Sequence, residues 1–100
     1  MEISKQQDGE LVTVTLTGDV DLETSPKARE QFLEILEKKH SLHVNCSEIS
    51  AIDSSGIATL IEAFQNAQRQ KLDFRLIAVK ENVMRVLQLA RLDNVFPIAD

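Results

Sequence analysis

The sequence has few of the residues that most often carry crosslinks or catalysis. Cys46 is its single cysteine, so no disulfide can form within the chain, and the residue is expected to be small and buried. A zinc site needs more ligands than Cys46 and His43 provide. Tryptophan and tyrosine are absent, so the core has to be mostly aliphatic. Three unclustered glycines provide no nucleotide-binding loop.

Basic residues and long apolar runs are also scarce. The formal net charge is −5, from 16 acids and 11 scattered bases, whereas a nucleic-acid binder usually carries a basic face. No apolar run approaches the roughly 20 residues of a membrane span. The segment 1–8 is polar and resembles no signal peptide. We therefore expect a cytoplasmic protein that binds no nucleic acid and does not insert into a membrane.

Apolar residues make up 43% of the chain and recur with two periods. Alternation of apolar and polar residues is typical of strands, and spacings of three and four are typical of helices. The pattern predicts strands over 2–6, 12–17, 42–46, 74–79 and 94–98, and helices over 24–40, 57–71 and 81–90. The strand over 42–46 is expected to be central. The near-continuous apolar run over 74–79 predicts a strand that is covered on both faces.

Turn residues predict how these elements are connected. Asp8-Gly9 predicts a type I′ hairpin, and Gly18 is expected to end the second strand. A hydroxyl cap from Thr24-Ser25 with Pro26 at the first helical position predicts the start of the first helix. The segment 47–51 is expected to be a plain connection.

The order β-β-α-β-α-β-α-β predicts a single α/β domain over residues 1–100. Strands that alternate with helices form parallel sheets through right-handed crossovers, and the initial hairpin makes this sheet mixed. In such sheets the helix starts after parallel strands lie at one end, where sites usually form. By this rule the acidic loop near Asp21 and the turn at 53–56 are expected at the same end.

The turn Asp53-Ser54-Ser55-Gly56 is the main candidate site. One interpretation is a helix cap, which satisfies free N–H groups at a helix start. The other is a serine that accepts phosphate, because a helix N-terminus tolerates an added dianion. Gly56 is costly in the first helical turn but would let another molecule approach the backbone. A catalytic serine is disfavoured, since no G-x-S-x-G turn and no suitably placed histidine accompany it.

Two further groups each allow two interpretations. The acids Asp19, Asp21 and Glu23 form either a solvated loop or a rim for a basic partner surface. Three apolar residues off the main stripe of the last helix form either a broad buried face or an interaction patch; they are Met84, Leu89 and Leu92.

The motifs resemble those of one known family. Gly18-Asp19-Val20-Asp21 follows the second strand, and Asp53-Ser54-Ser55-Gly56 stands between a strand and a helix at mid-chain. Together with the strand over 42–46 they resemble the STAS domain of anti-sigma factor antagonists. The resemblance covers nearly the whole chain and implies the STAS fold.

The resemblance implies a regulator that is not an enzyme and that needs no cofactor of its own. Its partner would be an anti-sigma factor that is also a serine kinase with a histidine-kinase-like ATPase fold, and the partner would bind the ATP. The unphosphorylated protein would bind this kinase and release its client. The kinase would then phosphorylate Ser55, and a PP2C-like phosphatase would restore the free serine. The implied partner-binding residues are Asp21, Asp53, Ser54, Gly56, Ala58 and Thr59.

The sequence departs from many relatives at two positions. Asn45 replaces an aspartate near the end of the third strand, and Ala58 replaces a glycine, which adds a methyl group near the implied contact. An alternative function is a non-switching STAS subunit of a bacterial lipid or solute ABC transport complex. Ser55 favours the switch, because a transport subunit needs no phosphoacceptor.

Overall fold

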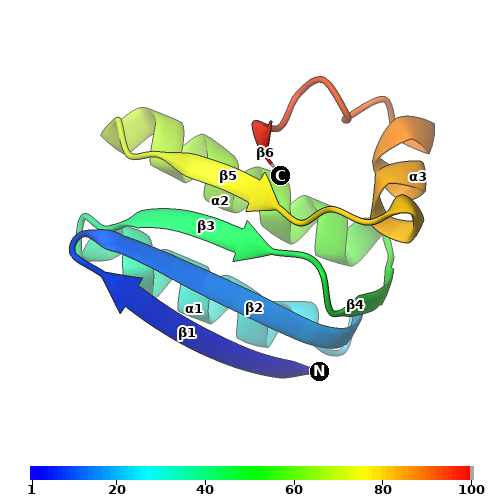
Figure 1. Cartoon of the computed structure of the whole chain (residues 1–100), viewed down its shortest axis with the longest axis horizontal. Coiled ribbons are helices and arrows are strands. Elements are labelled where there is room, and N and C mark those ends of the chain that lie inside the picture. Colours follow the sequence, from blue (N-terminus) through cyan, green and yellow to red (C-terminus); the bar gives the residue numbers. More distant parts are fainter. Residues whose placement is uncertain (100) are drawn as a thin grey trace.

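The chain folds into a mixed sheet with helices packed against it, and the computed structural model describes residues 1–99 (Figure 1). The predicted order of strands and helices is confirmed, with one short strand, β4, added where the sequence predicts a plain connection. In chain order the elements are β1 (Glu2–Asp8), β2 (Leu11–Val20), α1 (Ser25–Glu37), β3 (Ser41–Asn45), β4 (Ile49–Ile52), α2 (Ser54–Gln70), β5 (Phe74–Ile77), α3 (Glu81–Leu89) and β6 (Ile98–Ala99).

The six strands form one sheet in the order β1-β2-β3-β5-β6, with β4 paired to β2. β1 and β2 are antiparallel, and every other pair is parallel. β3 lies between β2 and β5, so its predicted central position is confirmed. Because the parallel strands point the same way, the loops that lead from β2 into α1 and from β4 into α2 leave the same end of the sheet.

Gly18 is the point at which β2 changes its partner. As far as Thr15 the strand pairs with β3, and from Gly18 to Val20 it pairs with β4. The register shifts between Gly18 and Asp19, and Gly18 has a φ of +100°, which a residue with a side chain rarely adopts. The prediction that Gly18 ends the strand is therefore wrong. The glycine allows the ladder to shift, and the strand continues to Val20.

The hairpin between β1 and β2 lies one residue later than predicted. Asp8 pairs with Leu11, which leaves Gly9 and Glu10 as the loop. Gly9 has a φ of +63°, whereas Glu10 does not have a positive φ. A positive φ at the first loop position alone is the pattern of a type II′ turn, so the type I′ turn predicted on Asp8-Gly9 is wrong.

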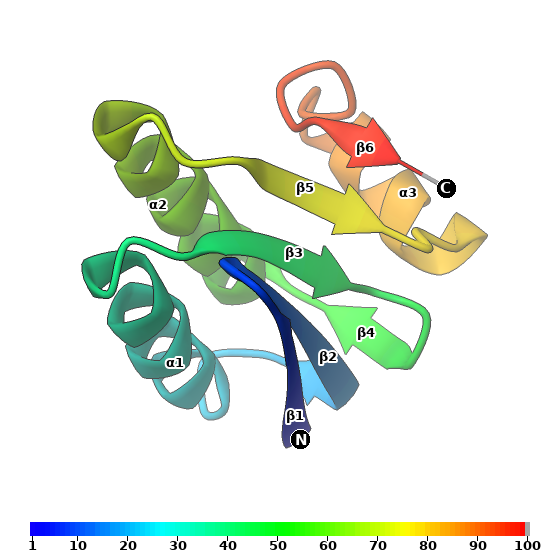
Figure 2. The same cartoon turned by 60° about the vertical axis from the view of Figure 1, so that its left-hand side comes forward.

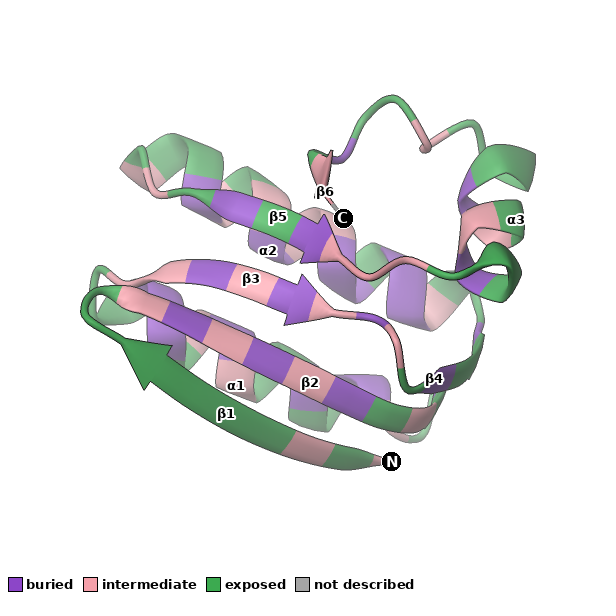
Figure 3. Cartoon of the chain, in the orientation of Figure 1, coloured by how far each residue is buried: buried purple, intermediate pink, exposed green. Residues whose placement is uncertain are grey.

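Helices α1 and α2 cover one face of the sheet and leave the opposite face open (Figures 1 and 2). The alternation of buried and half-buried residues along β2 and β3 follows from this arrangement (Figure 3). Arg75 of β5 is exposed beside His43 of β3. The prediction that this strand is covered on both faces is therefore wrong, since its second face meets solvent.

Three phenylalanines connect the last strand to the core. The ring centroids of Phe64, Phe74 and Phe96 lie between 5.5 and 6.3 Å apart. Phe96 is 4% exposed, and its N–H donates to the carbonyl of Leu92 in a turn. The strand predicted over 94–98 is therefore shorter, because a buried side chain and a turn, and not a β ladder, hold most of that segment.

Cys46 is fully buried in the segment that follows β3, as predicted. Burial raises the pKa of its thiol to about 12.

The Cys46 thiol should react slowly in the folded protein, because the thiolate is the reactive form. At pH 8 a disulfide-based thiol reagent should modify the folded protein more than about a hundredfold more slowly than the protein unfolded in guanidinium chloride. Stopped-flow absorbance measures both rates. Similar rates in the two states would show that the thiol is accessible.

Candidate functional site

The turn between β4 and α2 is built around the carboxylate of Asp53. The backbone of Asp53 is extended, and Oδ1 accepts hydrogen bonds from the N–H groups of Ser55 and Gly56 at 2.9 and 3.1 Å. These N–H groups belong to the first helical turn, which leaves them without backbone partners. Of the polar residues in the motif, Asp53 is therefore the helix cap.

The two serines of the motif do not serve as this cap. Ser54 is exposed and Ser55 is half-buried at the first two positions of α2. Within residues 1–99, neither serine hydroxyl forms a hydrogen bond. Because Asp53 already satisfies the helix start, both hydroxyls are free for chemistry with another molecule.

Gly56 faces the interior of the domain. A Cβ built on it would lie 2.6 Å from Cγ1 of Ile52 and 2.7 Å from the carbonyl oxygen of Val20. Both distances are shorter than real Cβ contacts. The expectation that Gly56 leaves room for another molecule is therefore wrong, because the chain itself fills this space. The glycine lets α2 approach the ends of β2 and β4.

The next turn of α2 separates an exposed residue from a buried one. Ala58 is exposed and lies one turn after Ser55 on the same side of the helix. Thr59 is only 8% exposed, and its hydroxyl donates to the Ser55 carbonyl at 3.1 Å. Ala58 is thus available to a partner, whereas the Thr59 side chain supports the helix from inside.

The loop after β2 is closed by the carboxylate of Asp21. Its Oδ1 accepts hydrogen bonds from the N–H groups of Glu23 and Thr24, both at 3.0 Å. The N–H of Thr24, together with weaker donors, holds the pKa of Asp21 below its ordinary value. The Asp21 side chain therefore shapes this loop.

The start of α1 differs from the predicted hydroxyl cap. Thr24 precedes the helix but makes no side-chain cap bond. Its hydroxyl accepts a hydrogen bond from the N–H of Asp21 at 2.9 Å and lies 2.9 Å from the carbonyl of Asp19. The prediction is wrong because Thr24 bonds backward into the loop, where its partners are closer than the helix start. Pro26 does stand at the start of the helix as predicted.

The acidic loop and the serine turn lie at the same end of the sheet, as predicted. Val20 pairs with Ile52 in the parallel ladder of β2 and β4. The N–H of Asp53 donates to the Val20 carbonyl at 3.1 Å. Since Asp21 follows Val20 directly, the two turns are adjacent, and they place the carboxylates of Asp21 and Asp53 in one region.

Leu22 is a surface residue of this region that the sequence pattern did not single out. It lies at the turn closed by Asp21, and 76% of its surface is exposed. An apolar residue between two acids in a predicted loop was the available signal. The strand and helix periodicities assign a face only to residues within those elements, so they do not predict that Leu22, in a loop, is exposed.

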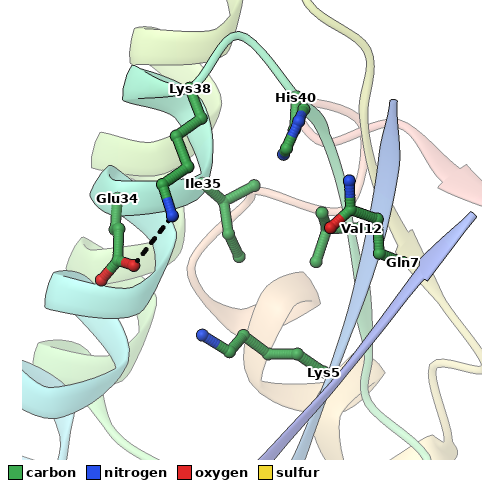
Figure 4. Close-up of a pocket in the computed structure, with 7 residues that line it drawn as sticks. All are labelled: Lys5, Gln7, Val12, Glu34, Ile35, Lys38 and His40. Carbon is green, nitrogen blue, oxygen red and sulfur yellow. Dashed lines mark hydrogen bonds and ion pairs between the residues drawn. The ribbon is translucent and has the colours of Figure 1, made fainter. Parts of the chain in front are cut away.

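The histidines lie away from this region. Nε2 of His43 is 2.8 Å from Oδ2 of Asp73 on the open face of the sheet, where Arg75 also contacts Asp73. His40 lines a separate cavity of about 220 Å³ between β1 and the end of α1 (Figure 4). Neither histidine is placed to act as a base for Ser55.

The cavity at the end of α1 contains none of the predicted site residues. It is lined by Lys5, Gln7, Val12, Glu34, Ile35, Lys38 and His40. Glu34 lies 3.3 Å from Lys38 and neutralises one of the bases (Figure 4). The carbonyl end of α1 adds a negative potential there, so the cavity has no clear preference for an anion.

The described part of the chain offers neither a cluster of metal ligands nor a membrane-spanning helix. Across residues 1–99, no group of three or more His, Cys, Asp or Glu side chains is arranged to hold a metal ion. None of the helices in the same residues has the length and apolar character that crossing a membrane requires.

The three apolar residues off the main stripe of the last helix differ in exposure. Met84 and Leu92 are half-buried, whereas Leu89 is 81% exposed.

Comparison with known proteins identifies the domain. The sequence profile of the STAS domain matches residues 2–100. The chain belongs to the STAS domain family. The resemblance seen in the motifs is thereby confirmed. The mixed sheet and helix order of this STAS domain are those expected for the family.

Individual relatives are distant in sequence but similar over most of their length. The STAS domain is 24% identical over 96 residues to the anti-sigma-B factor antagonist of Listeria monocytogenes, which covers 94% of this chain and 83% of that protein. A crystal structure from Thermotoga maritima has a TM-score of 0.91 at 20% identity, over 98% of this chain and 86% of that one. SpoIIAA of Bacillus in its phosphorylated form has a TM-score of 0.78 at 17% identity, over 99% and 92%.

Replacing Gly56 by alanine should destabilise the domain. The added methyl group would overlap the Val20 carbonyl and Ile52, and such overpacking typically costs about 1–3 kcal/mol. Urea denaturation of Gly56→Ala should show a loss of free energy of unfolding in this range. Ser54→Ala, on the exposed side of the same turn, should change it by less than about 0.5 kcal/mol. Equal stability of Gly56→Ala and the parent would contradict the close contact.

Asp21→Asn should lower stability in a pH-dependent way. The folded-state pKa of Asp21 is depressed, so the ionised carboxylate stabilises the fold above the unfolded pKa, near 4. This contribution is lost as the pH falls through the lower folded pKa. The urea midpoints of the parent and Asp21→Asn should therefore differ at pH 7 and converge as the pH falls below about 4. A difference that stays constant over this range would show that Asp21 acts without its charge.

Proposed function

We propose that this STAS domain is a phosphorylation-controlled regulator of an anti-sigma factor and is not itself an enzyme. In its unphosphorylated form it binds an anti-sigma factor that is also a serine kinase with a histidine-kinase-like ATPase fold. Binding releases the client of that factor, which is a sigma factor or another regulator. The names of the Listeria relative and of phosphorylated SpoIIAA support this function.

The observation that carries the proposal is the free hydroxyl of Ser55. Ser55 is half-buried at the start of α2, where Asp53 supplies the helix cap and the Ser55 hydroxyl has no hydrogen-bond partner within residues 1–99. A serine needed for capping would lose that function when modified. Here phosphorylation leaves the Asp53 cap in place, so the fold tolerates the change.

The phosphoryl transfer takes place with ATP bound by the partner. Oγ of Ser55 attacks the γ-phosphorus, the bond from that phosphorus to the β–γ bridging oxygen breaks, and ADP leaves. The hydroxyl proton passes to a base of the kinase, because the adjacent Asp53 carboxylate is engaged by the N–H groups of Ser55 and Gly56, and within residues 1–99 neither histidine lies near Ser55. This STAS domain therefore supplies only the nucleophile, in keeping with a substrate and not a catalyst.

The added charge acts mainly on the complex. A phosphoserine carries about −1.5 to −2 charges at pH 7, and a helix N-terminus accommodates an anion. The same dianion faces the phosphates of the nucleotide that the kinase retains and is repelled by them. Phosphorylation thus separates the partners. A PP2C-like phosphatase hydrolyses the phosphoserine and restores binding.

The surface used by the kinase is the end of the sheet that holds both turns. Ser54 and Ala58 are exposed beside Ser55, and the carboxylates of Asp21 and Asp53 flank them. Gly56 and Thr59 act from inside, by letting α2 approach the sheet and by bonding its first turn. Since the kinase uses intracellular ATP, the complex forms in the cytoplasm.

The test uses purified histidine-kinase-like ATPases encoded in the source genome, each incubated with the STAS domain and MgATP. One of them should phosphorylate the parent, and peptide mass spectrometry should place the phosphate on Ser55. Ser55→Ala should bind that kinase without being modified. Ser55→Asp should bind it about a hundredfold or more weakly, which corresponds to a loss of about 3 kcal/mol.

Ser54→Ala is the matched control: it keeps the acceptor hydroxyl and should still be phosphorylated on Ser55. Modification of Ser54 in place of Ser55 would refute the site. If no such kinase binds or modifies the domain while an ABC ATPase binds it, the transport-subunit interpretation would replace the switch.

A further inference from the structure

Leu22 is distinguished by its exposure at the candidate site. The exposed large hydrophobic residues within residues 1–99 are Leu22 at 76%, Leu89 at 81% and Val95 at 47%. The sequence contains no tryptophan or tyrosine that could form an aromatic contact with a partner. Leu89 and Val95 belong to α3 and the segment that follows it, which lie on the far side of β4 from the β2–α1 loop (Figures 1 and 2). Leu22 is therefore the large exposed apolar side chain of this region.

The loop that carries Leu22 is held in one conformation. The carboxylate of Asp21 binds the N–H groups of Glu23 and Thr24, and the Thr24 hydroxyl binds the N–H of Asp21. The carbonyl of Asp21 also accepts a hydrogen bond from the N–H of Ser25 at 2.7 Å. An apolar side chain on such a loop is ordered before binding, which lowers the entropy that an interface loses on association.

The loop is attached directly to the serine turn. Val20 precedes it, and the Val20 carbonyl accepts the N–H of Asp53 at 3.1 Å. Asp53 in turn binds the N–H of Ser55 at 2.9 Å. A kinase that reaches Ser55 is therefore brought close to the loop that presents Leu22.

Acidic residues flank Leu22. Asp19 is exposed near the end of β2, Glu23 is exposed on the loop itself, and Asp53 is exposed on the adjacent turn. The positive charges near it are Lys27, in the first turn of α1, and the N-terminal amino group of Met1, which acts on Asp21, so the exposed side chains next to Leu22 are mainly acidic. An apolar group within an acidic rim is complementary to an apolar pocket that is edged by lysine or arginine side chains.

We propose that Leu22 is the apolar anchor of this STAS domain, and that it inserts into an apolar, basic-rimmed pocket on the anti-sigma kinase. The inference rests on the proposed function and adds a docking contact separate from the phosphorylated residue. The anchor holds the kinase in place while Ser55 meets the nucleotide. Leu22 positions the complex and takes no part in phosphoryl transfer.

The experiment measures binding and phosphorylation by the purified kinase that modifies Ser55 in the preceding test. Leu22→Ala should raise the Kd for the ADP-bound kinase at least about tenfold, the effect expected of an interface anchor. It should raise the KM for phosphorylation of Ser55 by a similar factor and leave kcat within about twofold, because the reacting atoms are unchanged. Isothermal titration calorimetry and a radiolabel transfer assay measure these quantities.

Two variants serve as controls. Leu89→Ala removes an equally exposed leucine on α3 and should leave Kd and KM unchanged. Leu22→Met keeps an apolar side chain of similar volume and should retain parent affinity within about threefold. Since Leu22 is exposed, the thermal midpoint of Leu22→Ala should stay within a few degrees of the parent, which separates lost docking from lost folding.

Several outcomes would overturn the anchor. Parent affinity of Leu22→Ala would refute it and leave the Ser55 switch intact. An equal loss in Leu89→Ala would show a diffuse apolar effect. If Leu22→Ala changed only self-association, measured by sedimentation, the occupant would be a second copy of this chain and the proposal would be wrong. If no kinase bound or modified the parent, the proposed function itself would fail.

Discussion

The close contact between the start of α2 and the end of β2 is the constraint on which the site depends. A side chain on Gly56 would collide with the Val20 carbonyl, and that carbonyl also accepts the N–H of Asp53. The short strand β4 pairs with β2 at the same place and delivers the chain to the helix start. Because glycine permits this approach, Asp53 is positioned to cap α2 and Ser55 remains free. The geometry of one backbone contact thus leaves the serine hydroxyls of the turn available.

The inner side of the turn packs in the core, and its outer side is exposed to a partner. Gly56 and Thr59 face inward, where the domain is packed, whereas Ser54 and Ala58 face outward. A domain with a net stability of about 5–15 kcal/mol could not absorb a dianion in its core. At the helix start the same dianion would meet solvent and the positive end of the helix dipole, so its cost would fall on a bound partner. The proposed cycle of phosphorylation and dephosphorylation requires a fold that stays unchanged, and this division meets that requirement.

Most of the fold could be predicted from periodicity, and the errors share one physical cause. Local patterns find strands and helices because each element needs an apolar face, whatever it packs against. They missed β4, because a strand of four residues is stabilised by pairing with β2 and not by its own pattern. They misread Gly18 for the same reason, since its positive φ accommodates a change of partner strand. The exposure of Arg75 likewise depends on which face the helices cover.

For the candidate site, the sequence by itself determined the chemistry at the strand-to-helix junction: an acid, two hydroxyls and a glycine. It also determined that Asp21 and this junction share an end of the sheet, because parallel strands impose that geometry. Only the tertiary structure decided which group caps the helix, what fills the space at Gly56, and that Leu22 is exposed. The space at Gly56 and the placement of Asp53 both depend on an atom from a distant part of the chain, the Val20 carbonyl. Local sequence records which groups are present, whereas the folded backbone determines which of them meet.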